Sequence, residues 1–205
     1  MNKKILMIVD YQNDFVKEDG KLCVPGAINI KENIQKLIDK KIFDKKLISF
    51  DTHPNKIKYQ QTDEYKIYGF DIHCEYKKEG WWLHGIKLPN YEKFKEKIST
   101  INNVFQKIEI EDEVYFTKDK FDIWDNQQTF QKYIEQNIDK TDIIYIVGVA
   151  TNYCVFSNAM GFVKRGYKVK IVSDCVKEIQ DDSFEQNMNV MKNRNIEFIA
   201  SKDVK

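Results

Sequence analysis

The hydrophobic positions of this chain fall into short, nearly unbroken apolar runs separated by stretches with helical spacing. Apolar runs of this length are typical of strands buried on both faces of a parallel sheet. Apolar residues recurring every three or four positions are typical of amphipathic helices. The pattern predicts strands at 4–9, 47–50, 113–116, 143–147, 167–172 and 196–199, and helices at about 28–42, 90–108, 130–138, 155–160 and 182–192.

This alternation predicts an α/β protein with three layers, in which a doubly wound, mostly parallel sheet carries helices on both faces. A chain of 205 residues is long enough for one well-filled core, so we expect a single domain spanning 1–205. The stretch 55–88 is rich in Tyr, Lys and Trp and has no clear periodicity. Insertions that long are usually functional or disordered, and the aromatic content favours a packed lid. The roles of Trp81, Trp82 and His84 within it stay open.

Charge and composition narrow the function classes. The formal net charge is +1, with 33 basic and 32 acidic residues, which argues against a nucleic-acid partner or an acidic membrane surface. No apolar run approaches the ~20 residues of a membrane span, and no cleavage site follows the first apolar run. We therefore expect a cytoplasmic protein. The four cysteines are too far apart for a zinc knuckle or a disulfide scaffold.

Cys154 lies where the predicted strand 143–147 leaves the sheet and a helix begins. Open α/β sheets bind ligands at the carboxyl ends of their strands. The free N–H groups and positive dipole at the start of a helix favour an anion, so they would lower a thiol pKa and could hold an oxyanion. Cys154 is therefore a candidate nucleophile. The alternative is that Cys154 is a small buried core residue, as most free cysteines are.

Other predicted strands also end in polar residues. Asp10 follows the strand 4–9, and Lys118 lies just beyond the strand 113–116. Taken alone, Asp10 could be a capping residue and Lys118 a solvated lysine. Asp51 and His53 follow the strand 47–50 and can point to one side. A carboxylate with an imidazole is a reasonable start to a site for a divalent transition metal.

The chain resembles the isochorismatase-like cysteine hydrolases, and within them the nicotinamidase branch. Six motifs carry the resemblance in the order that the family has them, namely ILMIVDYQNDF at 5–15, DTHP at 51–54, FDIHC at 70–74, EGWWLH at 79–84, TKDKFDIW at 117–124 and GVATNYCV at 148–155. The resemblance implies the isochorismatase-like hydrolase fold and a catalytic triad of Asp10, Lys118 and Cys154. In such a triad the carboxylate can exchange a proton with the thiol and the leaving amine, and the ammonium favours the thiolate.

The same resemblance implies the surroundings of the triad. A cis peptide would join Val149 to Ala150, and the N–H groups of Ala150 and Cys154 would bind the oxyanion. A divalent metal, zinc first and iron or manganese as alternatives, would be held by the residues Asp51, His53 and His73. Phe15 and Phe70 match aromatic positions that flank a substrate ring, although either could equally be core.

Four positions depart from the nicotinamidase pattern. Thr52 stands where many members have Trp, no His occurs in 56–60, Asp119 replaces a frequent Gly, and Asn152 replaces the usual Asp. The triad is left intact. We therefore expect a hydrolase of a small amide, nicotinamide first, in NAD salvage, with another small amide or a urea as the alternative. A non-catalytic binding or scaffold protein of the same fold is the second class. Because family members are often dimers or tetramers, a homo-oligomer is an open expectation.

Overall fold

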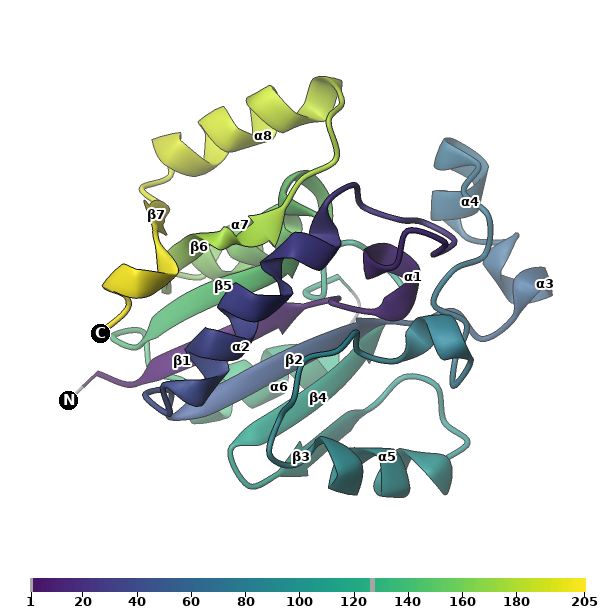
Figure 1. The fold of residues 1–205 in the computed structure, drawn as a ribbon, viewed down its shortest axis with the longest axis horizontal. Coiled ribbons are helices and arrows are strands. Elements are labelled where there is room, and N and C mark those ends of the chain that lie inside the picture. The colour runs from purple at the N-terminus through teal and green to yellow at the C-terminus, as the bar shows by residue number, and fades with distance from the viewer. Residues whose placement is uncertain (1, 126–127) are drawn as a thin grey trace.

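A seven-stranded sheet runs through the centre of the molecule in the computed structural model, which describes residues 2–125 and 128–205 (Figure 1). The spatial order of the strands is β3-β4-β2-β1-β5-β6-β7. Neighbouring strands are parallel except β3 and β4, which confirms the mostly parallel sheet. The strands are β1 (Lys4–Val9), β2 (Lys45–Asp51), β3 (Lys107–Ile110), β4 (Glu113–Lys118), β5 (Ile143–Val149), β6 (Lys168–Lys177) and β7 (Glu197–Ile199).

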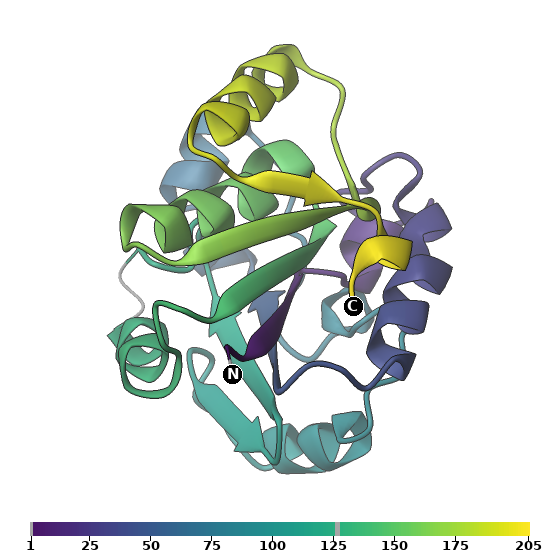
Figure 2. The ribbon, with the colours of Figure 1, turned by 90° about the vertical axis from the view of Figure 1, so that its left-hand side faces the viewer.

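Helices cover both faces of this sheet, as Figure 2 shows from the side. On one face α2 (Lys31–Asp39) and α5 (Tyr91–Ser99) share a core with Leu6 and Ile8 of β1. On the other face α6 (Gln128–Asn137), α7 (Phe156–Lys164) and α8 (Asp182–Asn193) share a core with Ile5, Met7 and Val9. Successive residues of β1 therefore enter different cores, and none of the five is exposed. This explains why the strand is apolar at every position from Ile5 to Val9.

The segment 55–88 lies beyond the carboxyl ends of the strands and contains two short helices (Figure 1). These are α3 (Lys56–Tyr59) and α4 (Asp63–Tyr68), and α1 (Asn13–Val16) packs close by. Trp81 is fully buried against Phe50 of β2, so its role is in the core. The remaining short turns are Ala27–Ile30, Glu79–Trp81, Thr151–Val155 and Ser201–Asp203. Across the described residues no helix is both long and apolar enough to cross a membrane.

The prediction of one helix over 90–108 is wrong. Helix α5 ends at Ser99, and residues 107–110 form the antiparallel edge strand β3. A tight turn at Glu111 and Asp112 joins β3 to β4, and Glu111 adopts a left-handed φ of 58°. Gly or Asn usually marks such a position, so a turn built on Glu gives little signal in the sequence.

The winding of the sheet reverses between β1 and β5. From β1 the chain builds outward through β2 and β4, and then returns to place β5 against the other side of β1. Gly148 of β5 lies opposite Val9 and has a φ of +114°. A Cβ at this glycine would stand 2.0 Å from the carbonyl oxygen of Val9, so only glycine lets the two strand ends approach this closely.

Gly148→Ala is expected to lower the free energy of unfolding by about 2–4 kcal/mol, because the substitution adds a backbone clash to an unfavourable φ. Gly166→Ala is the matched control. Gly166 also has a positive φ, +83°, but nothing lies within 4 Å of its Cβ position, so its cost is about 1 kcal/mol. Urea unfolding of both variants measures the difference, and equal destabilisation would contradict the close approach at Gly148.

Candidate active site

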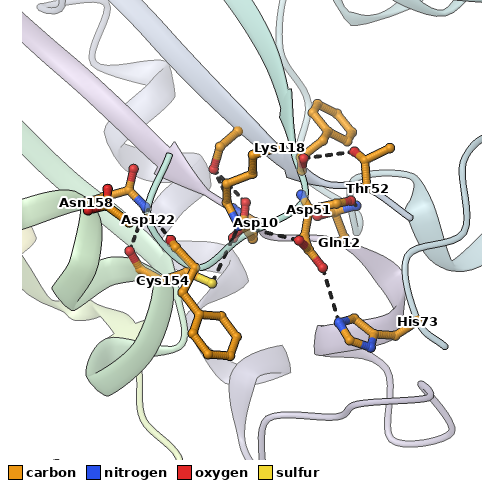
Figure 3. A network of polar contacts seen from close by, with 12 residues as sticks. Asp10, Gln12, Asp51, Thr52, His73, Lys118, Asp122, Cys154 and Asn158 are labelled. Carbon is orange, nitrogen blue, oxygen red and sulfur yellow. Dashed lines mark hydrogen bonds and ion pairs between the residues drawn. The ribbon is translucent and has the colours of Figure 1, made fainter. Parts of the chain in front are cut away.

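Asp10, Lys118 and Cys154 converge where the winding of the sheet reverses, at the carboxyl ends of β1, β4 and β5 (Figure 3). Lys118 Nζ lies 2.7 Å from Asp10 Oδ2 and 3.6 Å from Cys154 Sγ. Asp10 and Lys118 are fully buried, and Cys154 is 6% exposed. The structure thus brings together the three residues that the sequence places at separate strand ends. Open α/β sheets bind ligands at such reversal points.

Ser49 of β2 orients the carboxylate of Asp10. The Ser49 hydroxyl donates a hydrogen bond of 2.6 Å to Asp10 Oδ1, and the backbone N–H of Asp10 donates to Ser49 Oγ at 3.3 Å. Asp10 itself adopts a left-handed φ of 46°, which is uncommon for a residue with a side chain. With Oδ1 held by Ser49, Oδ2 faces Lys118. The sequence reasoning missed Ser49, although a serine inside the apolar run 47–50 was a usable signal.

Cys154 lies in a π-helical turn, Thr151–Val155, between β5 and α7. Turns of this type are rare and often occur at functional sites. The peptide bond between Val149 and Ala150, just before the turn, is cis. The side-chain amide of Asn158 donates to the carbonyl oxygen of Cys154 at 2.6 Å, and Asn158 is fully buried. A side chain of α7 therefore fixes the backbone of the turn that carries Cys154.

Burial controls the ionisation of this cluster. It raises the pKa of the Cys154 thiol well above its ordinary value, and the ammonium of Lys118 offsets only part of that rise. Burial alone would lower the pKa of Lys118, but the charges of Asp10, Cys154 and Asp51 raise it well above the usual range. The resting cluster therefore holds a charged lysine and a protonated thiol. Lys118 lowers the pKa of the thiol as expected, but the expected net lowering is wrong, because desolvation of the thiolate outweighs it.

A second polar cluster lies beside the triad. Asp51 Oδ2 is 3.1 Å from His53 Nε2 and 3.2 Å from His73 Nε2, and ligand atoms of all three residues lie within 4.8 Å of one another. Glu64 of α4 approaches the same nitrogens, at 3.4 Å from His73 and 3.7 Å from His53. The sequence reasoning missed Glu64, which stands in a segment without periodicity and outside any motif. Lys118 Nζ lies 3.5 Å from Asp51 Oδ1 and so links the two clusters.

The donor set fits a divalent transition metal. His73 Nδ1 is 2.9 Å from the carbonyl oxygen of Asp71, which leaves Nε2 directed at the cluster. His53 is fully buried, and neither ring nitrogen makes a hydrogen bond of good geometry among the described residues, although Nε2 lies 3.1 Å from Asp51 Oδ2. Two imidazoles and a carboxylate are typical zinc ligands, and a backbone carbonyl on the second ring nitrogen commonly orients a metal-binding histidine.

Gln12 fixes the backbone that carries Asp51. Its side-chain amide donates to the carbonyl oxygens of Asp51 and Trp81, at 2.9 and 2.8 Å, and its Oε1 accepts the N–H of Asp51 at 2.8 Å. Gln12 is fully buried. It lies in the motif after Asp10, yet sequence reasoning gave it no role. The side chain ties β2 and the segment 55–88 to the loop after β1.

A narrow, mostly apolar pocket opens over both clusters. Its lining includes Cys154 and Ala150 together with Asp51 and His73, and the space is about 430 Å³, including solvent at the mouth. The walls include Phe15 and Phe70, the two aromatic residues that were predicted. They also include Phe121, Tyr153 and Ile179, which were not predicted. The rings of Phe15 and His73 are 5.4 Å apart. Phe15 is also packed into the core, so the alternative core role holds alongside its place in the wall.

Residues 4–203 match the family model of the isochorismatase domain. The nicotinamidase of Saccharomyces cerevisiae is 29% identical over 197 residues, which cover 87% of this chain and 90% of that protein. The fold is similar to that of the Pyrococcus horikoshii pyrazinamidase in complex with zinc, with a TM-score of 0.73, 24% identity and coverage of 97% of this chain and 99% of that one. It is also similar to a protein of L. infantum in complex with nicotinate, with a TM-score of 0.74, 20% identity and coverage of 98% and 94%. At these identities the solved structures establish the fold alone.

Proposed function

The chain belongs to the isochorismatase family, and from that premise we propose that it is a nicotinamidase, which hydrolyses nicotinamide to nicotinate and ammonia. The observation that carries the proposal is the buried contact of Lys118 with both Asp10 and Cys154 at the base of an aromatic pocket. A non-catalytic scaffold would gain nothing from a buried thiol, ammonium and carboxylate in contact, since such groups are costly to bury.

We propose that Asp10 acts as the general base. The thiol of Cys154 is protonated at rest, so its proton must leave before or as the sulfur attacks. The proton passes to the Asp10 carboxylate, and the sulfur bonds to the amide carbon, whose oxygen becomes an oxyanion. The backbone N–H groups of Ala150 and Cys154 would hold that oxyanion. Lys118 keeps its charge and stabilises both the Asp10 carboxylate and the thiolate.

The remaining steps return the proton. Protonated Asp10 donates to the amide nitrogen, the C–N bond breaks, and ammonia leaves a thioester on Cys154. A water molecule then gives a proton to Asp10 and attacks the thioester carbon. The second tetrahedral intermediate collapses, the C–S bond breaks, and Asp10 returns the proton to the sulfur. The products are a carboxylic acid, which ionises to nicotinate, and the original thiol.

Asp51, His53 and His73 would hold a divalent ion, for which we propose zinc, with Glu64 within reach of the same position. When bound, such an ion supplies a Lewis-acidic anchor for a pyridine nitrogen. The substrate would then have to be a flat molecule that carries both a ring nitrogen, which reaches the ion, and an amide, which reaches Cys154. The distance between the ion and Cys154 would set the spacing of these two groups. Phe15 and Phe70 would pack on the faces of that ring.

An ammonia-release assay on a panel of small amides tests the substrate. We expect nicotinamide to be hydrolysed with a kcat/KM at least about tenfold above that of benzamide, which lacks the ring nitrogen, because one anchoring contact is lost. Acetamide and urea, which fill little of the pocket, should be poorer still. If urea or an aliphatic amide were the best substrate, the second candidate, a hydrolase of other small amides or ureas, would replace this one.

The metal cluster is tested separately by metal analysis of purified protein. His73→Ala is expected to lower bound metal from about one ion per chain by tenfold or more under dialysis, since one of three principal ligands is removed. His84→Ala is the matched control, because His84 Nδ1 contacts Asn13 and lies outside the cluster. Retention of a full equivalent of metal by the His73 variant would show that the ligand set is wrong.

Composition and family membership support a proposal about where the enzyme acts and on what. We propose that the chain acts as one cytoplasmic domain on a small amide, in NAD salvage, and that segment 55–88 serves as the lid and metal-binding insertion. His73 and Phe70 come from this segment, and both line the pocket.

A further inference from the structure

Asn152 is a buried hydrogen-bond hub two residues before Cys154. It is 2% exposed, and its side-chain amide lies 3.0 Å from the carbonyl oxygen of Ile179, 3.0 Å from Asp181 Oδ1 and 2.8 Å from Ser183 Oγ. Its own Oδ1 accepts the N–H of Ile179 at 3.1 Å. The side chain of Asn187 in α8 donates to the Asn152 carbonyl oxygen at 2.8 Å. The π-helical turn is thus tied to the connection between β6 and α8 from several directions.

Asp181 accepts the remaining hydrogen bonds of this network. Its Oδ2 accepts the hydroxyl of Tyr153 at 2.7 Å, and its Oδ1 accepts the N–H and hydroxyl of Ser183 at 2.8 and 2.6 Å, which caps the start of α8. Burial opposes its charge, but the hydrogen bonds from Ser183, Tyr153 and Asn152 together lower the pKa of Asp181 below its usual value. Asp181 is therefore an ionised acceptor at the exposed end of the network, with Asn152 on its buried side.

The network ends on the wall of the substrate pocket. Tyr153 and Ile179 both line that pocket, together with Cys154. Tyr153 is held by Asp181, and the backbone of Ile179 is held by Asn152 through both its N–H and its carbonyl oxygen. The ring of Tyr153 also meets Phe121 on the next wall, with centroids 5.4 Å apart. A shift of Asn152 or Asp181 would therefore move the wall and the turn that carries the sulfur.

We propose that Asn152 and Asp181 form a positioning pair, in which a neutral amide at position 152 is required to hold the Cys154 turn and the Tyr153–Ile179 wall against Asp181. This inference rests on the proposed amide hydrolysis, for which it supplies a determinant outside the triad. The chemistry requires a donor, because Asp181 only accepts. A carboxylate at position 152 would place two anions about 3 Å apart and also oppose the carbonyl oxygen of Ile179.

The test is the pH profile of kcat/KM for Asn152→Asp relative to wild type between pH 5.5 and 8.5. At pH 8 we expect a loss of about tenfold or more, because a charge-assisted hydrogen bond becomes a repulsion. As the pH falls, the introduced carboxyl is protonated before Asp181, since the former is buried, and its O–H can donate as the amide does. The ratio to wild type should then rise toward one. Within the described part of the chain, Asp181 is the charged group bonded to Asn152, and Tyr153 is the other titratable group of the network.

The double variant Asn152→Asp/Asp181→Asn is the control. It keeps one carboxylate beside an amide, so the repulsion between two anions is gone and only the opposition to the Ile179 carbonyl oxygen remains. Its ratio to wild type should therefore depend on pH much less than that of the single variant. Asn33→Asp changes an amide that bonds the carbonyl of Asp174 instead, and it should not reproduce the profile. If Asn152→Asp is too unstable at pH 8 to assay, its melting temperature relative to wild type should rise on acidification. A flat ratio, or wild-type activity throughout, would overturn the pair. An inactive wild type would instead remove the proposed function.

Discussion

Replacing Cys154 with alanine is expected to abolish ammonia release from nicotinamide, with kcat lowered by at least about 10⁴-fold, because the sulfur is the atom that forms the covalent intermediate. The remaining residues of the site can bind and polarise an amide but cannot form the thioester. The measurement is steady-state ammonia release by protein whose melting temperature matches wild type.

Cys175→Ala is the matched control for that loss. Cys175 is fully buried in the core on one face of the sheet and does not line the pocket. Its substitution should cost about 1 kcal/mol of stability and leave kcat within a few-fold of wild type. Comparable activity of the Cys154 and Cys175 variants would rule out Cys154 as the nucleophile.

Asp10→Asn is expected to slow turnover and, at the same time, to make Cys154 ionise more readily. Hydrolysis should fall by about 10³-fold, since the base that accepts the thiol proton and returns it to the amine is gone. Alkylation of Cys154 by iodoacetamide at pH 7.5 should nevertheless become faster. The negative charge of Asp10 raises the pKa of the thiol, so removing that charge lowers the pKa and increases the thiolate fraction.

Lys118→Met is expected to have the opposite effect on the rate of Cys154 alkylation. The ammonium of Lys118 lowers the pKa of the thiol, so its loss should leave less thiolate and slow the alkylation. Labelling is followed by mass spectrometry of the peptide that contains Cys154, and excess nicotinamide should protect it. Slower labelling of the Asp10 variant than of wild type would contradict the charge arrangement described for the site.

The architecture and the position of the triad residues at strand ends follow from local pattern in the sequence. β1 has the bounds that the apolar run 4–9 predicts, because a strand buried on both faces must be apolar throughout. Parallel strands end at one edge of the sheet, so polar residues after β1, β4 and β5 had to lie near one another. The family resemblance, and not the local pattern, then assigned Asp10, Lys118 and Cys154 to one triad.

The parts that were missed depend on tertiary contacts without local signal. Glu64 reaches the cluster of Asp51, His53 and His73 only because α4 folds over the ends of the strands. Gln12 acts through backbone groups of a distant strand. The direction of the Cys154 pKa shift depends on how completely the surrounding chain excludes water, which spacing along the sequence does not encode. The edge strand β3 is short and half-exposed, so its apolar residues fit a helical period equally well.

The reversal of winding beside β1 also constrains synthesis of the chain on the ribosome. β1 is made first but lies in the middle of the sheet, with β5 as one of its two partners. Until residues up to Val149 emerge from the exit tunnel, one edge of β1 has no partner strand, and the apolar face that α7 covers stays open until Lys164 has emerged. A nascent chain of this protein should therefore engage holdase chaperones late in elongation, and translational pauses before β5 should increase its aggregation.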